Sequence, residues 1–170
     1  VEEELQSLKE KYPNAVIDVI ATKNNMQVFK NQRSIDNIII LEFKKIFDLI
    51  KHVRKYDLAF DLEPYLNFSS LLTFFFSKYR IGFNHGIRSI LYNSSSTFYN
   101  DKHIVLSYMD LIKCIDNKAR VPKKLMELRF TESASRNVKK ILRENRILKS
   151  TFLMGFCPGV GASVKEREWS

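Results

Sequence analysis

Apolar residues along the chain alternate between strand-like runs and helix-like spacing. The clearest strand-like run is residues 38–41, a continuous Ile-Ile-Ile-Leu stretch bounded by polar residues, as expected for a parallel strand that is covered on both faces. A stretch with helical spacing follows at residues 43–53, where lysine and aspartate separate the apolar positions and indicate an amphipathic helix. Its apolar positions are Phe43, Ile46, Phe47, Ile50 and Val53.

The same patterns predict the other elements of the chain. Further helices are predicted over residues 2–11, 24–29, 66–77, 103–115 and 133–148, the last capped by Ser133. Further strands are predicted over residues 16–20, 58–62, 80–83 and 151–157. The serine-rich tract 93–97 is predicted to be a loop, and residues 116–130 a connecting segment. We expect the apolar residues of helix 66–77, which include Leu71 and Phe75, to lie in the core, and Val138, Ile141 and Leu142 to face inward.

Alternating strands and helices predict an α/β fold with a doubly wound, mostly parallel sheet. Such a sheet normally opens with a strand, whereas this chain opens with the helix that should follow it. We therefore expect the first strand of the sheet to lie upstream of Val1. A length of 170 residues suits one ordinary domain, so we expect no complete active site between two large domains.

The charge of the chain is strongly unbalanced. There are 28 lysine and arginine residues against 19 aspartate and glutamate residues, a formal net charge of +9. This excess favours an anionic partner or a membrane surface, although it is equally compatible with a role in solubility alone. Cys114 and Cys157 do not have the spacing of a metal site, and the three histidines are scattered, so we expect no metal and a reducing compartment. The apolar stretch 71–76 is far shorter than the ~20 residues of a membrane-spanning helix.

Candidate chemistry is expected in loops that follow strands, because parallel α/β sheets bind ligands beyond the carboxyl ends of their strands. Glu63 could accept a hydrogen bond from a sugar hydroxyl or act as a base, with an ordinary turn acid as the alternative. Asn84 and Arg88 follow the next strand, and Arg88 could hold a phosphate or carboxylate with two hydrogen bonds. A solvated loop is the alternative for this second segment.

Small residues between Pro158 and Ser163 would let backbone N–H groups approach a phosphate, with Lys165 and Arg167 close enough in sequence to add charge. The turn lacks the Gly-Lys-Ser/Thr ending of a P-loop and the glycine spacing of a dinucleotide site. The chain also lacks a nucleophile elbow, a kinase loop and paired metal-binding acids, which argues against hydrolases and kinases.

Six segments in the same order resemble the lipopolysaccharide heptosyltransferase family, glycosyltransferase family nine. They are residues 5–19, 34–39, 55–62, 80–83, 102–103 and 157–159, followed by a basic pair and Trp169. The resemblance implies the N-terminal domain of a GT-B glycosyltransferase with Rossmann-like domains. It implies an acceptor-side domain at residues 1–130, a linker helix at 131–150 and the start of a nucleotide-sugar domain at 151–170.

The resemblance also implies site residues. Gly159 and Gly161 would lie in the turn near the donor phosphates, with Lys165 and with Arg167 in the place of the family's lysine. Glu63, Asn84 and Arg88 would face the acceptor, although Leu62-Glu63-Pro64 replaces the family's Leu-Gln-Gly. Catalysis would be metal-independent and need no cofactor, and the catalytic base would lie upstream of Val1. No catalytic residue is therefore expected within the 170 residues.

The implied function is transfer of a sugar from a nucleotide-sugar, ADP-heptose by the resemblance, to an anionic glycolipid of the lipopolysaccharide core. The implied location is cytoplasmic, peripheral at the inner face of the bacterial inner membrane, with the protein a monomer that binds no nucleic acid. We expect the 170 residues alone to be inactive. The alternative is a basic α/β module that binds a nucleotide or nucleic acid without transfer chemistry, which would require a continuous basic stripe with exposed aromatics.

Overall fold

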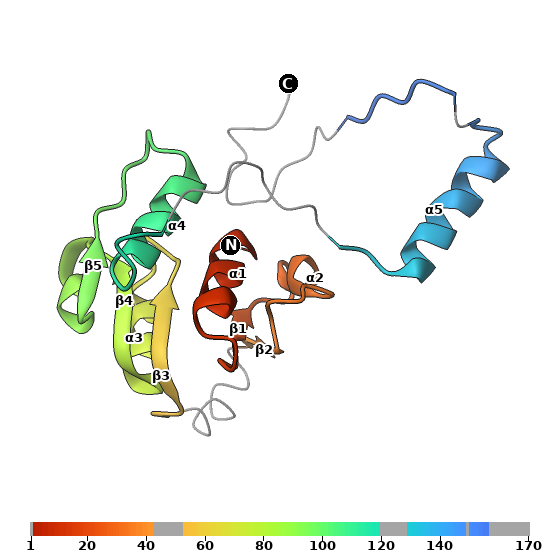
Figure 1. The fold of residues 1–170 in the computed structure, drawn as a ribbon. Coiled ribbons are helices and arrows are strands. Elements are labelled where there is room, and N and C mark those ends of the chain that lie inside the picture. The colour runs from red at the N-terminus through yellow and green to blue at the C-terminus, as the bar shows by residue number, and fades with distance from the viewer. Residues whose placement is uncertain (1, 43–52, 120–128, 149, 157–170) are drawn as a thin grey trace. The chain divides into compact units, whose positions relative to one another are not determined.

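The computed structural model describes residues 2–42, 53–119, 129–148 and 150–156 (Figure 1). The chain forms two compact units, Val1–Arg129 and Phe130–Ser170, called here the amino-terminal and carboxy-terminal units. Residues 43–52 of the predicted helix 43–53 and most of the predicted connecting segment 116–130 lie outside the described residues.

The amino-terminal unit contains helices and strands in alternation, and the carboxy-terminal unit contains one described helix. The helices are α1 (Glu2–Lys11), α2 (Met26–Phe29), α3 (Asn67–Phe76), the 3₁₀ helix η2 (Gly86–Leu91), α4 (Ile104–Lys113) and α5 (Glu132–Glu144). The strands are β1 (Asp18–Ala21), β2 (Asn37–Ile40), β3 (Tyr56–Asp61), β4 (Ser77–Phe83) and β5 (Ser94–Ser96). The α/β class predicted from the sequence is confirmed.

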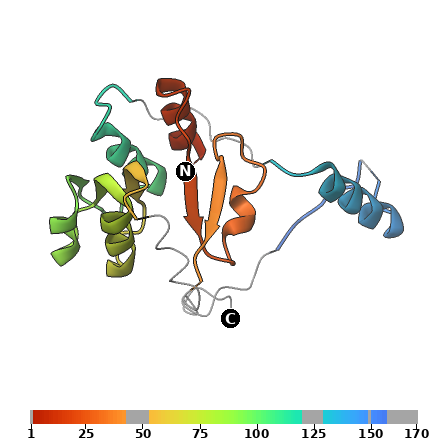
Figure 2. The same cartoon turned by 90° about the horizontal axis from the view of Figure 1, so that it is seen from below.

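All described strand pairs are parallel, as predicted, but they form two sheets. One sheet has the order β1-β2, with Asp18 opposite Asn37 and Ala21 opposite Ile40. The other has the order β3-β4-β5, with Asp61 opposite Gly82 and Phe83 opposite Ser96. Figure 2 shows α4 and α3 on opposite sides of β3 and β4.

Side-chain alternation along β3 and β4 separates an apolar face from a polar one. Ile81 and Phe83 of β4 are buried against Leu111 of α4. Leu58, Phe60 and Leu62 pack against the same cluster, as do Tyr108, Cys114 and Ile115 of the α4 segment. Successive strand residues point to opposite faces, so Asp61 and Gly82 lie on the other face. A methyl group on Gly82 would collide with the Tyr92 ring, which explains why this position carries no side chain.

Several predicted elements differ from the structure. The predicted loop 93–97 is wrong in its middle, because Ser94–Ser96 pairs in parallel with β4 as strand β5. The predicted strand 151–157 is wrong for its described residues: the Thr151 Oγ1 accepts a hydrogen bond from the Leu148 backbone N–H, and this closes a turn there. The cap of α5 is Thr131 and not Ser133, because the Thr131 Oγ1 accepts the Ala134 backbone N–H at 3.1 Å.

Four predicted core positions are also wrong, two on α3 and two on α5. Leu71 and Phe75, four residues apart on α3, are 44% and 52% exposed, whereas Phe76 is buried. A helix that covers one face of a sheet contacts it along one stripe only, so an apolar sequence on all sides leaves an outer stripe exposed. Val138 and Ile141 of α5 were also predicted to face inward, and both are exposed, because α5 buries no residue among the described residues.

Candidate functional site

The parallel strands β3, β4 and β5 end at one edge of their sheet, and the segments after them meet there. The Glu63 loop follows β3, Asn84 and His85 follow β4, and the segment containing Phe98 and Asn100 follows β5. This edge is where open α/β sheets bind ligands. We call these three segments together the carboxyl-edge site.

A buried ion pair lies under this edge. The Arg88 Nη2 donates to the Asp61 Oδ2 at 2.7 Å and to the Ser69 Oγ at 3.2 Å. The Tyr92 hydroxyl donates to the same Asp61 oxygen at 2.6 Å and accepts hydrogen bonds from the Arg88 Nε and Nη2. The side chains of Arg88 and Asp61 are 0% and 3% exposed. Burial, together with the Asp61 carboxylate, raises the pKa of the Tyr92 hydroxyl well above its ordinary value, although Arg88 opposes the shift.

This ion pair connects the loops on which the candidate residues lie. The other Asp61 oxygen, Oδ1, accepts the backbone N–H of Glu63 at 3.1 Å. The Glu63 carboxylate in turn accepts the backbone N–H of Tyr65 at 3.0 Å. Arg88 lies on η2, and Asp61 ends β3, so their bond fixes the position of η2 against the end of β3. Side chains from α3, β3 and η2 thereby support the Glu63 loop.

Aromatic contacts hold the outer layer of the site. The Tyr65 ring meets His85 edge-on at 5.6 Å and Phe98 at 5.7 Å between ring centroids. The Tyr65 hydroxyl donates to the Asn100 Oδ1, and the Asn84 backbone N–H donates to the Ser96 carbonyl. These contacts bring the three segments of the carboxyl-edge site together.

The predicted acceptor residues are all at this edge, in different environments. Glu63 is half-buried, and Asn84 is exposed beside exposed His85. Arg88 is buried and bonded to Asp61, and its Nη1 has no hydrogen-bond partner among the described residues. Contact of these residues with an acceptor stays a prediction. The predicted donor residues Gly159, Gly161, Lys165 and Arg167 lie outside the described residues.

Sequence reasoning missed Asp61, Tyr65 and Tyr92. An available signal was the charge of Asp61 at the end of an apolar strand, since a buried carboxylate requires a cation or hydrogen-bond donors. No sequence signal identifies Arg88 as that cation, because the two residues are far apart in the chain.

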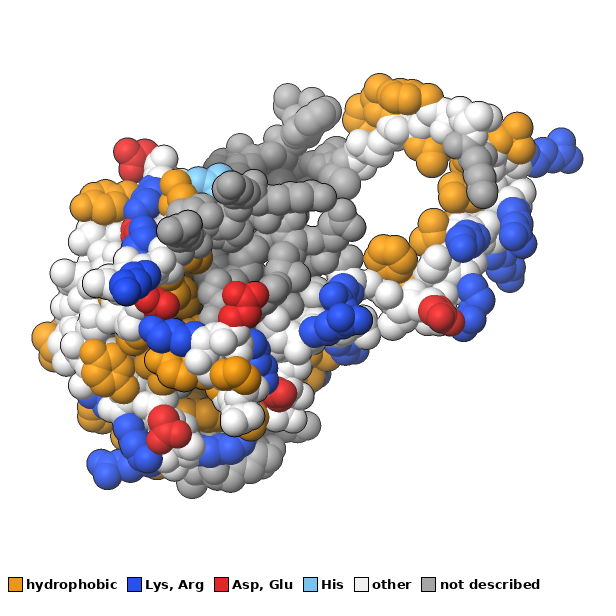
Figure 3. Space-filling view, viewed as in Figure 1, with side chains coloured by type: hydrophobic (Ala, Val, Ile, Leu, Met, Phe, Trp, Pro, Cys, Tyr) orange, Lys and Arg blue, Asp and Glu red, His pale blue; other side chains and the backbone are white. Residues whose placement is uncertain are grey.

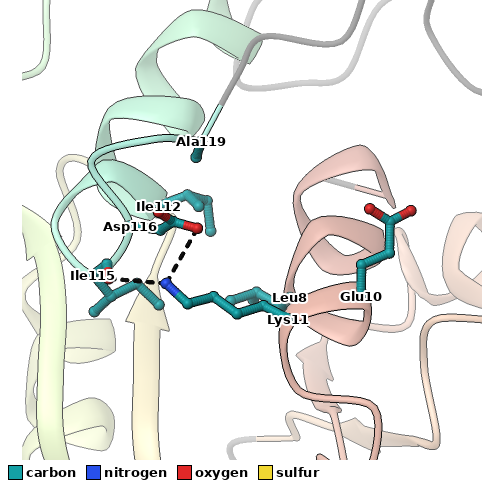
Figure 4. Close-up of a pocket in the computed structure, with 7 residues that line it drawn as sticks. All are labelled: Leu8, Glu10, Lys11, Ile112, Ile115, Asp116 and Ala119. Atoms are coloured by element: carbon teal, nitrogen blue, oxygen red, sulfur yellow. Dashed lines mark hydrogen bonds and ion pairs between the residues drawn. The ribbon is translucent and has the colours of Figure 1, made fainter.

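A pocket of about 370 Å³ lies between α1 and α4, away from these loops (Figure 4). The Lys11 ammonium crosses it to the Asp116 carboxylate at 3.1 Å and to the Ile115 carbonyl at 3.4 Å. The other residues that line it are Leu8, Glu10, Ile112 and Ala119. Its one lysine is already paired with an acid, so the pocket offers no uncompensated charge to an anion.

Basic side chains are spread over the surface in view and do not form one stripe. Figure 3 shows lysine and arginine side chains along α5 and at separate places on the amino-terminal unit. Within the described ranges, no group of three histidine, cysteine or acidic residues could hold a metal ion. In the same ranges, no helix combines the length and apolar character needed to cross a membrane.

Comparison with known proteins gives matches to solved structures alone: no family model and no curated protein sequence matches. A family 9 glycosyl transferase from Veillonella parvula matches with a TM-score of 0.77 and 16% identity, over 98% of this chain and 50% of that chain. The E. coli ADP-heptose LPS heptosyltransferase II matches at 0.64 with 20% identity, over 93% and 50% of the two chains. The E. coli heptosyltransferase WaaC with ADP matches at 0.59 with 14% identity, over 75% and 45%.

The chain spans about half the length of each of these structures. The resemblance inferred from the sequence is therefore confirmed as a likeness of fold. The described architecture is that of the family 9 glycosyltransferases, the heptosyltransferases among them, over roughly half of their length.

Proposed function

We propose that the chain is the acceptor-side part of a glycosyltransferase that transfers a sugar from a nucleotide-sugar to an anionic glycolipid. The observation that carries the proposal is the fold match to the Veillonella parvula glycosyl transferase over 98% of this chain. ADP in the WaaC structure supports a nucleotide-sugar as the donor. Both E. coli structures are heptosyltransferases, which supports a heptose, and hence ADP-heptose, as the donor sugar.

The proposed reaction is direct displacement at the anomeric carbon of the donor. A base removes the proton of the acceptor hydroxyl as its oxygen attacks, and cationic groups stabilise the departing diphosphate. Gly159, Gly161, Lys165 and Arg167 are proposed to bind that diphosphate, by the backbone N–H groups of the glycines and the charges of the other two. The base is proposed to come from outside the 170 residues.

The carboxyl-edge site is proposed to bind the acceptor. Glu63 and Asn84 offer hydrogen-bonding groups to sugar hydroxyls, and exposed His85 adds a third. Arg88 is proposed to support this site from below through its ion pair with Asp61, because its side chain is fully buried. The proposal includes peripheral binding of a monomer at an anionic membrane face, which the net charge of +9 favours.

The proposal is tested with the complete reading frame that contains these 170 residues. Purified enzyme is incubated with ADP-heptose, or with other nucleotide-sugars, and a phosphorylated lipid-linked acceptor. Mass spectrometry is expected to show the acceptor gaining one sugar residue. Nucleic-acid binding without any sugar transfer would instead support the alternative module. The 170 residues alone are expected to show no transfer and no micromolar nucleotide-sugar binding in calorimetric titration.

Glu63→Gln tests the acceptor role within that assay. Loss of the carboxylate is expected to raise the KM for the acceptor about tenfold, since one hydrogen bond to a charged group contributes roughly 1.5–3 kcal/mol. The KM for the donor should stay unchanged. Glu144→Gln, an exposed glutamate at the end of α5, is the matched control and should leave both constants unchanged. Equal changes in the two variants would exclude an acceptor role for Glu63.

A further inference from the structure

The outer surface of α3 and η2 carries large apolar side chains that are exposed. On the 3₁₀ helix η2, Ile87 and Ile90 are 73% and 77% exposed, and a spacing of three residues places both on one face. Leu66, at the amino end of α3, is 63% exposed. Leu71 and Phe74, about one turn apart on α3, are exposed as well. We call these five residues the α3–η2 surface.

Two contacts join the two helices that carry this surface. The Arg88 Nη2 of η2 donates to the Ser69 Oγ of α3 at 3.2 Å, and the two helices lie side by side (Figures 1 and 2). The Arg80 guanidinium lies 5.2 Å from the centre of the Phe74 ring, and its Nε donates to the Leu91 carbonyl at 2.7 Å. Arg80 therefore connects the carboxyl end of α3 with that of η2. Exposed apolar residues that gather in this way mark an interaction site.

The segment that forms this surface contains no acidic residue. Residues 64–100 include neither aspartate nor glutamate, although the chain has 19 of them. Within the described residues, Arg80 has no acidic partner, since its hydrogen bonds go to backbone carbonyls. Asp57, on the neighbouring strand, is compensated by Lys78 at 2.8 Å. Glu63 lies just outside the segment, with its carboxylate bonded to a backbone N–H. The α3–η2 surface would thus meet anionic groups without repulsion.

A bilayer that contains anionic lipids matches this combination of apolar side chains and a cation. Apolar side chains gain free energy when they enter the boundary between headgroups and acyl chains, and an adjacent arginine can keep its charge at the headgroups. An acid at the same place would be repelled by the negative surface. The net charge of +9 attracts the chain to such a membrane but does not select a face. The α3–η2 surface provides a reason for one face to be selected.

We propose that the α3–η2 surface docks on an anionic bilayer, with Leu66, Ile87 and Ile90 inserted at the headgroup boundary and Arg80 at a lipid phosphate. The proposal rests on the membrane binding that the proposed function includes, assigns that binding to one face, and does not require sugar transfer. Residues 84 and 85 of the carboxyl-edge site directly precede η2, so the site borders this surface. A lipid-linked acceptor could thus keep its acyl chains in the bilayer while its sugars reach the site.

Sedimentation of the 170-residue chain with vesicles of phosphatidylglycerol and phosphatidylcholine tests the surface. Ile87→Ser combined with Ile90→Ser removes two apolar side chains and leaves the net charge unchanged. Partition into the vesicles is expected to fall roughly tenfold, because apolar burial contributes in proportion to its area. The matched control combines Val16→Ser with Val28→Ser, two exposed valines elsewhere in the amino-terminal unit. This control should bind as the unchanged chain does, and circular dichroism should show both double variants folded.

A second measurement reports insertion directly. Ile90→Trp places a fluorescent side chain on η2, and lipids with brominated acyl chains quench tryptophan that enters the bilayer. Quenching is expected to be stronger for Ile90→Trp than for the unchanged chain, which contains Trp169. Val28→Trp is the matched control and should be quenched no more than the unchanged chain.

Equal losses of vesicle binding in the two double variants would overturn the proposal, and so would equal quenching of the two tryptophan variants. Self-association, seen by light scattering and removed by Ile87→Ser with Ile90→Ser while vesicle binding persists, would assign the surface to a second copy of the chain instead. Absence of binding to any vesicle would overturn the docking surface together with the proposed membrane binding. Sugar transfer to an acceptor in detergent is measured separately, so failure of the docking surface and failure of the proposed transfer are distinguishable.

Discussion

A fully buried arginine is stable in a protein interior only when an acid compensates its charge and other groups accept hydrogen bonds from its guanidinium. Arg88 meets the Asp61 carboxylate, the Tyr92 hydroxyl and the Ser69 hydroxyl, all within 3.2 Å. The same carboxylate accepts the Glu63 backbone N–H, so the pair also determines where the Glu63 loop begins. Loss of either charge would leave the other buried without compensation.

Arg88→Met is therefore expected to lower the free energy of unfolding by about 3–5 kcal/mol, the usual cost of breaking a buried ion pair. The matched control is Lys78→Met, which breaks the 2.8 Å pair with Asp57 at the surface, where both side chains are mostly exposed. That loss in the free energy of unfolding should be much smaller, because water screens an exposed ion pair. Urea denaturation measures both values. Similar losses in the two variants would show that the Arg88 pair adds little stability.

Asp18 provides a pH-dependent contribution to stability. Burial opposes ionisation, but hydrogen bonds from Asn37, Tyr56 and Lys55 outweigh it and hold the pKa of Asp18 below its ordinary value. A carboxylate with a lowered folded-state pKa stabilises the protein above its unfolded pKa of about 3.9. That stabilisation is lost as the pH falls through the lower folded-state value.

Asp18→Asn is expected to flatten the fall in stability below about pH 4, because the amide does not titrate. At pH 7 the variant should be about 1–3 kcal/mol less stable, since the Tyr56 hydroxyl and Lys55 lose a charged acceptor. Thermal unfolding between pH 3 and 7 provides the measurement. If the stability of Asp18→Asn falls below pH 4 as steeply as that of the unchanged protein, Asp18 is not responsible for that fall.

Elements whose ends are set by local chemistry were predictable from the sequence. Helix α1 was predicted with its observed bounds, because Tyr12-Pro13 cannot continue a helix. Strand β5 was not, because serine has little intrinsic strand preference, and pairing with β4 decides the conformation. The positions of Glu63 and Asn84 at the carboxyl edge could be predicted, because both follow predicted strands. The pairing of Arg88 with Asp61 could not, because the two residues are far apart in the chain and meet only in the folded structure. The donor turn lies outside the described residues.

The amino end of α5 shows how a neighbouring hydroxyl can mislead a prediction. Thr131 and Ser133 are both able to cap a helix, but only the Thr131 Oγ1 accepts the Ala134 backbone N–H. Thr131→Ala is expected to destabilise α5 by about 1 kcal/mol and to speed amide exchange in its first turn. Ser133→Ala, the matched control, should change exchange little. A larger effect of Ser133→Ala than of Thr131→Ala on amide exchange would instead identify Ser133 as the cap.

For the whole chain, the net charge of +9 predicts attraction to anionic surfaces. The 170-residue chain should sediment with vesicles that contain phosphatidylglycerol and not with vesicles of phosphatidylcholine alone. Each lysine or arginine near the surface contributes roughly 1 kcal/mol, and salt screens this attraction. Binding should therefore fall steeply between 0.05 and 0.5 M salt, roughly the range over which the Debye length shortens several-fold. Binding that is independent of salt or lipid charge would contradict an electrostatic origin.

The edge strands of the two described sheets differ in how readily they would pair with another molecule in a concentrated solution. Strand β5 is three residues long and consists of serines, and a short polar edge gives a neighbouring molecule little to pair with. The edge strands β1, β2 and β3 instead contain apolar residues such as Ile20, Ile40 and Phe60. Aggregation of the 170-residue chain is thus expected to begin at these three strands, and charged residues introduced there should improve solubility more than changes at β5.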